Sequence, residues 1–109
     1  MLRTEEQQKS LCASCPFAKT ANIIGDSVVL LIVRDLFSGP KRFGDLEASL
    51  AGVSTRTLAD KLKMLEEEGL ATRDEFVGKP PRVEYTLTRK GSGLKKIYDA
   101  MVSYGEKHL

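Results

Sequence analysis

Two cysteines near the N-terminus have the type and spacing suited to redox chemistry. Cys12 and Cys15 are separated by two residues, which allows an internal disulfide or lets one thiol resolve an oxidised form of the other. Cys15 precedes Pro16, which fits the first turn of a helix, and a helix N-terminus beside Lys19 favours the thiolate. Cys15 and Cys12 are therefore candidate redox-sensing residues, while a structural cap at Cys15 and an incidental Cys12 would produce the same pattern.

Residues for metal or catalytic sites are scarce. A closed zinc site needs four nitrogen or sulfur ligands, and Cys12, Cys15 and His108 supply three. An intersubunit metal site could use the cysteines of two chains, but no other feature of the sequence supports it. The sequence lacks a Gly-rich phosphate loop, a G-x-S-x-G elbow and an H-E-x-x-H pair, and nothing positions His108 as a general base. We expect no enzyme activity, no cofactor and no metal site.

Basic and hydroxyl side chains gather at the start of a long predicted helix. Ser54 is its expected N-cap and Gly69 its end. An apolar stripe of leucines at 58, 62 and 65 is expected to face the core, which turns the polar side chains outward. Such groups can hydrogen-bond to bases and phosphates. The residues that we expect to contact DNA here are Thr55, Arg56, Thr57, Asp60 and Lys61, with Lys63 ranked lower.

A basic loop follows that helix. Residues 78–82 join two strand-like runs, Leu70–Val77 and Val83–Leu87, as a hairpin whose tip contains Pro80-Pro81. Lys79 and Arg82 are placed to contact phosphates or a minor groove. A solvated turn would have the same composition, so the hairpin alone does not decide the function.

A second predicted helix and a tight turn precede the long helix. Phe43, Leu46 and Leu50 lie on one face of a predicted helix, and a tight turn at Ala51-Gly52-Val53 separates it from Ser54. Two helices joined in this way form a helix-turn-helix, whose second helix enters the major groove of DNA. Arg42, just before the first of these helices, is a further candidate phosphate anchor.

Three more helices are predicted around this unit. One starts at Pro16 and stops at Gly25; a second, Val28–Phe37, follows a cap at Asp26 or Ser27 and should be largely buried. A buried strand has the same local pattern, but Ser38-Gly39-Pro40 is typical of a helix end. Thr88 is expected to cap one final helix whose apolar side carries Leu94, Ile97, Tyr98, Met101 and Val102.

Length and charge limit which classes of protein this chain can belong to. The 109 residues fit one domain, which we place at residues 15–109, with a flexible N-terminal arm at 1–14. A net charge of +2 is too small to indicate a nucleic-acid partner by itself. The longest apolar run, residues 28–33, is too short to cross a membrane, and the polar start contains no signal-peptide core. We therefore expect a cytoplasmic protein without a membrane partner.

Several motifs together point to a family. The most specific are R-F-G-D-L (Arg42–Leu46) and P-P-R-V-E-Y-T-L-T (Pro80–Thr88). The other matching positions are Cys15-Pro16, Ile24-Gly25, Leu31-Ile32, Arg34-Asp35-Leu36, Gly39-Pro40, Gly52-Val53-Ser54, Leu58, Leu62, Leu65-Glu66, Gly69-Leu70 and Gly91. With these motifs the chain resembles the HxlR family, small winged helix-turn-helix transcriptional regulators of bacteria and archaea, over roughly residues 15–105.

The resemblance implies a mainly α fold with a small β-hairpin, and a homodimer built through the first and last helices. Cys15 matches a position at which several family members sense oxidants or electrophiles. One departure is visible: after the glycine matching Gly25 the family usually has Gly-Lys-Trp, whereas this chain has Asp26-Ser27-Val28 and so lacks a large core aromatic.

The sequence therefore predicts a regulator that binds double-stranded DNA as a homodimer on a pseudo-palindromic operator, with an oxidant or electrophile as its effector through Cys15. The alternative is a winged-helix module that binds another protein instead of DNA. That alternative requires an exposed apolar patch on the recognition face, and Arg56, Thr57 and Asp60 provide none.

Overall fold

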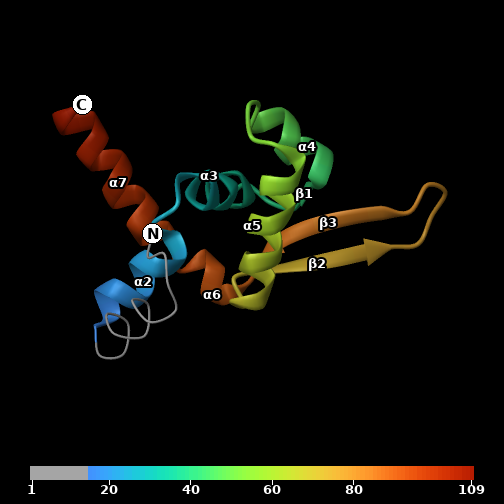
Figure 1. Ribbon diagram of the computed structural model, residues 1–109, viewed down its shortest axis with the longest axis horizontal. Helices are drawn as coiled ribbons and strands as arrows, with labels where there is room; N and C mark the ends of the chain where they lie inside the picture. The colour runs from blue at the N-terminus through green and yellow to red at the C-terminus, as the bar shows by residue number, and fades with distance from the viewer. Residues whose placement is uncertain (1–14) are drawn as a thin grey trace.

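The computed structural model describes residues 15–109 (Figure 1). The predicted N-terminal arm, residues 1–14, and Cys12 within it lie outside the described residues. The elements are α2 (Pro16–Ile24), α3 (Ser27–Leu36), β1 (Lys41–Arg42), α4 (Phe43–Ser49), α5 (Thr55–Glu67), β2 (Ala71–Phe76), β3 (Arg82–Leu87), α6 (Arg89–Ser92) and α7 (Lys95–His108). The fold is mainly helical with a small antiparallel sheet, as predicted.

Helix α3 is the centre of the core. The alternative prediction, that this segment forms a buried strand, is wrong. The segment is a helix, and the Asp26 carboxylate caps it by accepting hydrogen bonds from the backbone N–H groups of Val28 and Val29. Four of its apolar side chains are buried. The chain bends by 81° between α2 and α3. A Cβ at Gly25 would overlap the carbonyl oxygen of Ala21, so the corner requires a glycine.

Helices α4 and α5 form the predicted helix-turn-helix. The turn between them contains Gly52 at φ +99°, a conformation that side chains rarely adopt. The leucines of α5 lie against the core as their spacing predicts, with Leu58 and Leu65 fully buried and Leu62 exposed by 1%. This burial fixes which face of α5 remains available to solvent.

The sheet contains one strand that the sequence pattern did not predict. Strand β1 pairs with β3, so that Lys41 lies opposite Tyr85 and Arg42 opposite Glu84, and the strand order is β1-β3-β2. The expected hairpin, β2 with β3, is confirmed. Two residues are too few to show an alternating pattern, so only the partner strand reveals β1.

The prediction of one helix after Thr88 is wrong. Thr88 does cap a helix, through a 3.1 Å hydrogen bond from the Gly91 N–H to its Oγ1, but that helix, α6, ends at Ser92 and α7 starts at Lys95. The Gly91-Ser92-Gly93 segment has low helix propensity. Gly91 is also held against the carbonyl group of Leu70, which ties α6 to the end of the helix-turn-helix unit.

Helices α2 and α7 lie on the side of α3 opposite the β2–β3 hairpin (Figure 1). No residue of α7 is buried within the chain. Its first turns are held by an edge-to-face contact between Tyr98 and Phe37, whose ring centroids are 5.4 Å apart. Among residues 15–109, no single helix is long and apolar enough to cross a membrane. Helices α2 and α3 have the required length and apolar composition only when taken together, and they are bent against each other.

Candidate nucleic-acid interface

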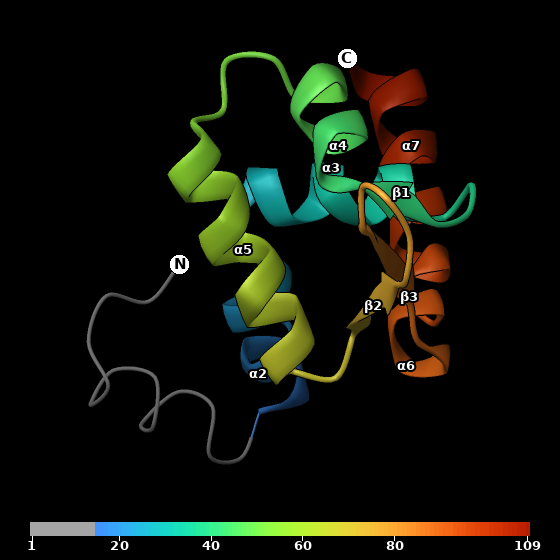
Figure 2. The ribbon, with the colours of Figure 1, turned by 90° about the vertical axis from the view of Figure 1, so that its right-hand side faces the viewer.

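The outer face of α5 carries charged side chains with no partner. Arg56, Asp60 and Lys63 are exposed, and within the part of the chain that the structure describes none of them makes an ion pair or a side-chain hydrogen bond. Figure 2 shows α5 and the β2–β3 hairpin on the same side of the molecule. Unpartnered donors and acceptors on an exposed helix face are free to bind a ligand's polar groups.

The two threonines predicted to contact DNA are already hydrogen-bonded. The Thr55 hydroxyl donates to Glu47 Oε2 at 2.9 Å, which joins the start of α5 to α4. The Ser54 hydroxyl donates to Thr57 Oγ1 at 2.9 Å and accepts a bond from the Thr57 N–H at 3.1 Å. These bonds fix the N-terminus of α5, and the sequence pattern had not identified Glu47 as part of that junction.

Lys61, another predicted DNA contact, lies on the flank of α5 and faces α3. Its Nζ is 2.7 Å from Asp26 Oδ2, and the two side chains are only 24% and 18% exposed. The hydrogen bond from Lys61 holds the pKa of Asp26 below its ordinary value, with help from the Val29 and Val28 N–H groups and against the opposing effect of burial. Asp26 therefore joins α5 to the start of α3, a contact between residues 35 positions apart that no local motif signals.

Of the two hairpin cations predicted to contact DNA, Lys79 is free and Arg82 is paired within residues 15–109. Lys79 is exposed and without a partner among the described residues. Arg82 Nε lies 3.0 Å from Glu84 Oε2, and its guanidinium sits over the Phe76 ring, 4.9 Å from the centroid. The positive charge that is most accessible in this hairpin therefore lies at the loop.

Arg42 connects the helix-turn-helix to the hairpin. It belongs to β1, opposite Glu84 of β3, and its N–H donates a 2.9 Å hydrogen bond to Asp45 Oδ2 in the first turn of α4. Its side chain is exposed. The structure thus places Arg42 where α4 begins, beside the base of the hairpin.

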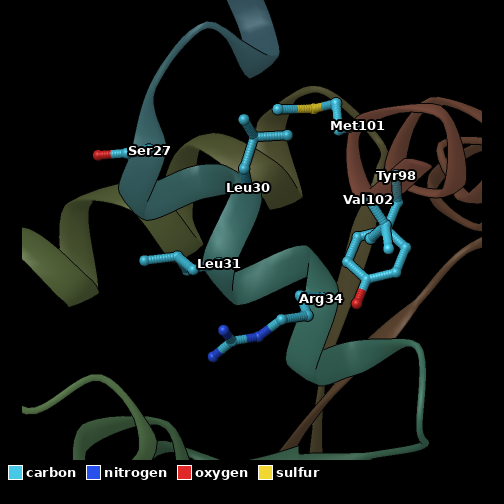
Figure 3. Close-up of a pocket in the computed structure, with 7 residues that line it drawn as sticks. All are labelled: Ser27, Leu30, Leu31, Arg34, Tyr98, Met101 and Val102. Atoms are coloured by element: carbon cyan, nitrogen blue, oxygen red, sulfur yellow. The ribbon is translucent and has the colours of Figure 1, made fainter. Parts of the chain in front are cut away.

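A second feature is an apolar surface formed by α2, α3 and α7, which we call the α2–α7 face. One pocket of about 360 Å³ lies between α3 and α7 (Figure 3), and a neighbouring pocket of about 380 Å³ lies between α2 and α7. Leu30 and Met101 line both pockets, so the two are contiguous. Phe17, Met101 and Val102 are exposed by 81%, 50% and 41%. Single exposed apolar residues are common, but a continuous apolar surface marks an interaction site.

Cys15 is the N-cap residue of α2, at one end of this face. Its carbonyl oxygen accepts the Lys19 N–H at 3.0 Å, but its side chain makes no capping hydrogen bond. The thiol is partly buried. The structure therefore confirms the position that the sequence predicted for Cys15 and leaves its side chain without a capping role.

Comparison with known proteins agrees with this geometry. The HxlR-like helix-turn-helix family model matches residues 23–109. The HTH-type transcriptional regulator YvaP of Bacillus subtilis is 44% identical over 84 residues, covering 76% of this chain and 78% of its own. A structure described as a MarR-family transcriptional regulator from Porphyromonas gingivalis W83 superposes with a TM-score of 0.83 at 30% identity, covering 100% and 99% of the two chains.

A second solved structure is that of YodB, a transcriptional regulator of Bacillus subtilis, in its reduced form. It superposes with a TM-score of 0.77 at 32% identity and covers 86% of this chain and 93% of its own. The matched family region includes the helix-turn-helix, the hairpin and α7. The relatives named here are described as transcriptional regulators, and this chain belongs to the HxlR-like helix-turn-helix family.

Proposed function

We propose that this chain regulates transcription by binding double-stranded DNA in a sequence-specific manner as a homodimer. The observation that carries the proposal is the outer face of α5, where Arg56, Asp60 and Lys63 have no partner among the described residues while the opposite face is fully buried. A recognition helix needs this combination, because it must be held rigidly while its polar groups stay free for base edges.

Each predicted DNA-contacting residue other than Lys61 receives a role from its surroundings. Arg56 and Asp60 read base edges in the major groove, and Lys63 contacts a neighbouring phosphate. Thr55 and Thr57 hold the helix N-terminus, which itself attracts a phosphate through its unpaired N–H groups. Lys79 and Arg42 contact the backbone on either side, whereas Arg82 supports the hairpin through Glu84 and Phe76.

The homodimer proposal rests on the α2–α7 face. Its two contiguous pockets and the exposed Phe17, Met101 and Val102 form an apolar surface that a second copy can cover around a two-fold axis. The face lies on the other side of α3 from the hairpin, so pairing leaves both interfaces with DNA open (Figure 1). The operator is then pseudo-palindromic, with half-sites about 34 Å apart or a multiple of that spacing.

Response to an oxidant or electrophile is the most specific part of the proposal. Support comes from Cys15, which is the N-cap residue of α2 at one end of the proposed dimer surface, and from YodB, whose structure was also solved after diamide treatment. A modified Cys15 would add bulk or charge beside this surface and rotate one subunit against the other. Since two recognition helices must enter adjacent major grooves together, such a rotation weakens binding. We place the regulator in the cytoplasm, together with the DNA that it binds.

The test is binding to duplex DNA at several salt concentrations. A duplex selected by the wild-type protein from a random pool is compared with an unselected duplex of the same length by fluorescence anisotropy. We expect about 10³-fold or greater preference for the selected duplex, and affinity that falls steeply with added salt because bound phosphates release counterions. Equal affinity for both duplexes, or binding independent of salt, would contradict the proposal. Binding to a protein partner instead needs an apolar patch on α5, whose exposed outer residues Arg56, Asp60 and Lys63 are all charged.

A further inference from the structure

We propose that Asp26 and Lys61 form a positioning pair that sets the orientation of the recognition helix, so that Lys61 serves DNA recognition through Asp26 and not through a phosphate. The proposal rests on the DNA-binding function proposed above. It assigns a role to Asp26, which lies at the corner between α2 and α3 and is remote in sequence from the helix-turn-helix.

The Asp26 carboxylate is bound on both of its oxygens. Oδ1 accepts the N–H groups of Val28 at 2.8 Å and Val29 at 3.2 Å, and Oδ2 lies 2.7 Å from Lys61 Nζ. Most surface ion pairs contribute little because two mobile side chains must be ordered. Here the cap has already ordered the carboxylate, and both side chains are more than three-quarters buried. The pair is therefore better defined than an ordinary surface contact.

The pair supplies a directional restraint that the core does not. Leu58, Leu62 and Leu65 fix which face of α5 is buried, but hydrophobic burial is non-directional and tolerates a small rotation about the helix axis. A short charge-assisted hydrogen bond on the flank is directional. Since a helix with its side chains is about 10–12 Å across, a rotation of about 10° moves a side-chain tip by about 1 Å. That displacement is enough to break a base contact made by Arg56.

The bond also joins α5 to the corner that carries the α2–α7 face. Gly25, adjacent to Asp26, packs against the Ala21 carbonyl group without room for a side chain. The α2–α3 corner is thus closely packed, and the ion pair between Asp26 and Lys61 connects this corner to the middle of α5. The orientation of the recognition helix follows that of the proposed dimer surface.

The experiment compares four single variants, and the double variant of Asp26→Asn with Lys61→Met, on the selected and unselected duplexes. Asp26→Asn keeps the cap, because Asn caps a helix as well as Asp does, but removes the charge that holds Lys61. Lys61→Met removes the ammonium and keeps the aliphatic stem, and Lys61→Arg restores a cation. Lys63→Met is the matched control, since Lys63 lies on the same helix, exposed and unpaired among the described residues. Circular dichroism establishes that each variant is folded.

We expect Asp26→Asn and Lys61→Met each to lower affinity for the selected duplex about tenfold, with no further loss in the double variant, as for two side chains that act through one contact. Neither should change the salt dependence or the affinity for the unselected duplex, and Lys61→Arg should restore binding. Lys63→Met should instead weaken both duplexes alike and reduce the salt slope by about one unit. The proposal is overturned if Lys61→Met behaves as Lys63→Met does while Asp26→Asn binds normally.

A second measurement needs no DNA. Lysine acetylation followed by mass spectrometry should modify Lys61 more slowly than Lys63 in the wild type and equally fast in Asp26→Asn. A chain that binds DNA with Lys61 unprotected overturns the positioning pair alone. A chain that prefers no duplex, with Lys61 protected, overturns the proposed function and the positioning role together, so the two failures can be told apart.

Discussion

Gly91 packs its α-carbon directly against the carbonyl group of Leu70, and no side chain fits between them. The same carbonyl oxygen accepts the Thr88 N–H at 3.0 Å, while the Thr88 hydroxyl donates to the Gly69 carbonyl oxygen at 2.6 Å. Lys90 Nζ adds a 2.8 Å bond to the Glu68 carbonyl oxygen. The end of the hairpin and α6 are thus tied to the C-terminal end of the recognition helix.

Substitution of Gly91 should therefore weaken the fold. In Gly91→Ala the new methyl group overlaps the Leu70 carbonyl group, and relieving that overlap should cost about 1–3 kcal/mol of the free energy of unfolding. Gly44→Ala is the control, because Gly44 lies in α4 with no atom near the added methyl group, and it should raise stability by up to about 1 kcal/mol. Urea denaturation followed by circular dichroism measures both. Equal stabilities would show that α6 can move away from Leu70.

Arg56 and Lys79 should differ in what they contribute to DNA binding. Arg56→Ala should cost about 1–3 kcal/mol on the selected duplex and relax sequence preference, since a base contact is lost. Lys79→Ala should weaken selected and unselected duplexes alike and flatten the salt slope by about one unit, since a phosphate contact is lost. Anisotropy titrations at several salt concentrations measure both effects. Small and equal effects of the two substitutions would contradict the assigned roles.

Acid should destabilise the chain partly through Asp26. Its pKa is lower in the folded chain than the ordinary value of 3.8, chiefly because of Lys61. A carboxyl group with a lowered folded pKa stabilises the fold above its unfolded pKa and loses that contribution as the pH falls through the folded pKa. Stability from this group should therefore be constant between about pH 5 and 8 and decline below about pH 4. Asp26→Asn should show a smaller decline, and Asp60→Asn, at an exposed unpaired position, should decline like the wild type.

The proposed dimer can be tested at Met101, which lines both pockets of the α2–α7 face. Met101→Asp places a charge on that apolar surface, and covering an unpaired charge costs several kcal/mol. We expect sedimentation at micromolar concentration to show a dimer for the wild type and a monomer for Met101→Asp. Ser103→Asp is the matched control, because Ser103 is exposed on α7 and lines neither pocket. A wild-type monomer that still prefers its selected duplex would contradict the homodimer.

Cys15 should control the response to oxidants. Diamide or a quinone should reduce affinity for the selected duplex about a hundredfold in the wild type, which requires about 2.7 kcal/mol of differential stability. Cys15→Ser should bind DNA normally and fail to respond. If mass spectrometry shows Cys15 modified while affinity is unchanged, Cys15 is only structural. The DNA-binding proposal does not depend on this result, since it rests on α5 and the hairpin.

Local patterns were sufficient to predict most of the elements and the face of α5 that is exposed. The Ser54 cap and the spacing of Leu58, Leu62 and Leu65 are properties of one short segment, and the structure confirms both. The same holds for α2, α3 and the hairpin, and the family followed from motifs that run through nearly the whole chain. Such features are readable because helix and strand periods repeat within a few residues.

Only the tertiary structure decided which of the predicted DNA contacts are free. The sequence predicted Thr55, Lys61, Arg56 and Lys63 all as DNA contacts on one helix, yet the first two are held by Glu47 and Asp26. Strand β1 likewise exists only because β3 lies beside it, and the position of α6 is set where Gly91 packs against Leu70. Each of these features depends on a partner from another element. Whether a hydrogen bond, an ion pair or a steric overlap forms depends on the distance between two groups in space. The spacing of residues along the sequence does not give that distance.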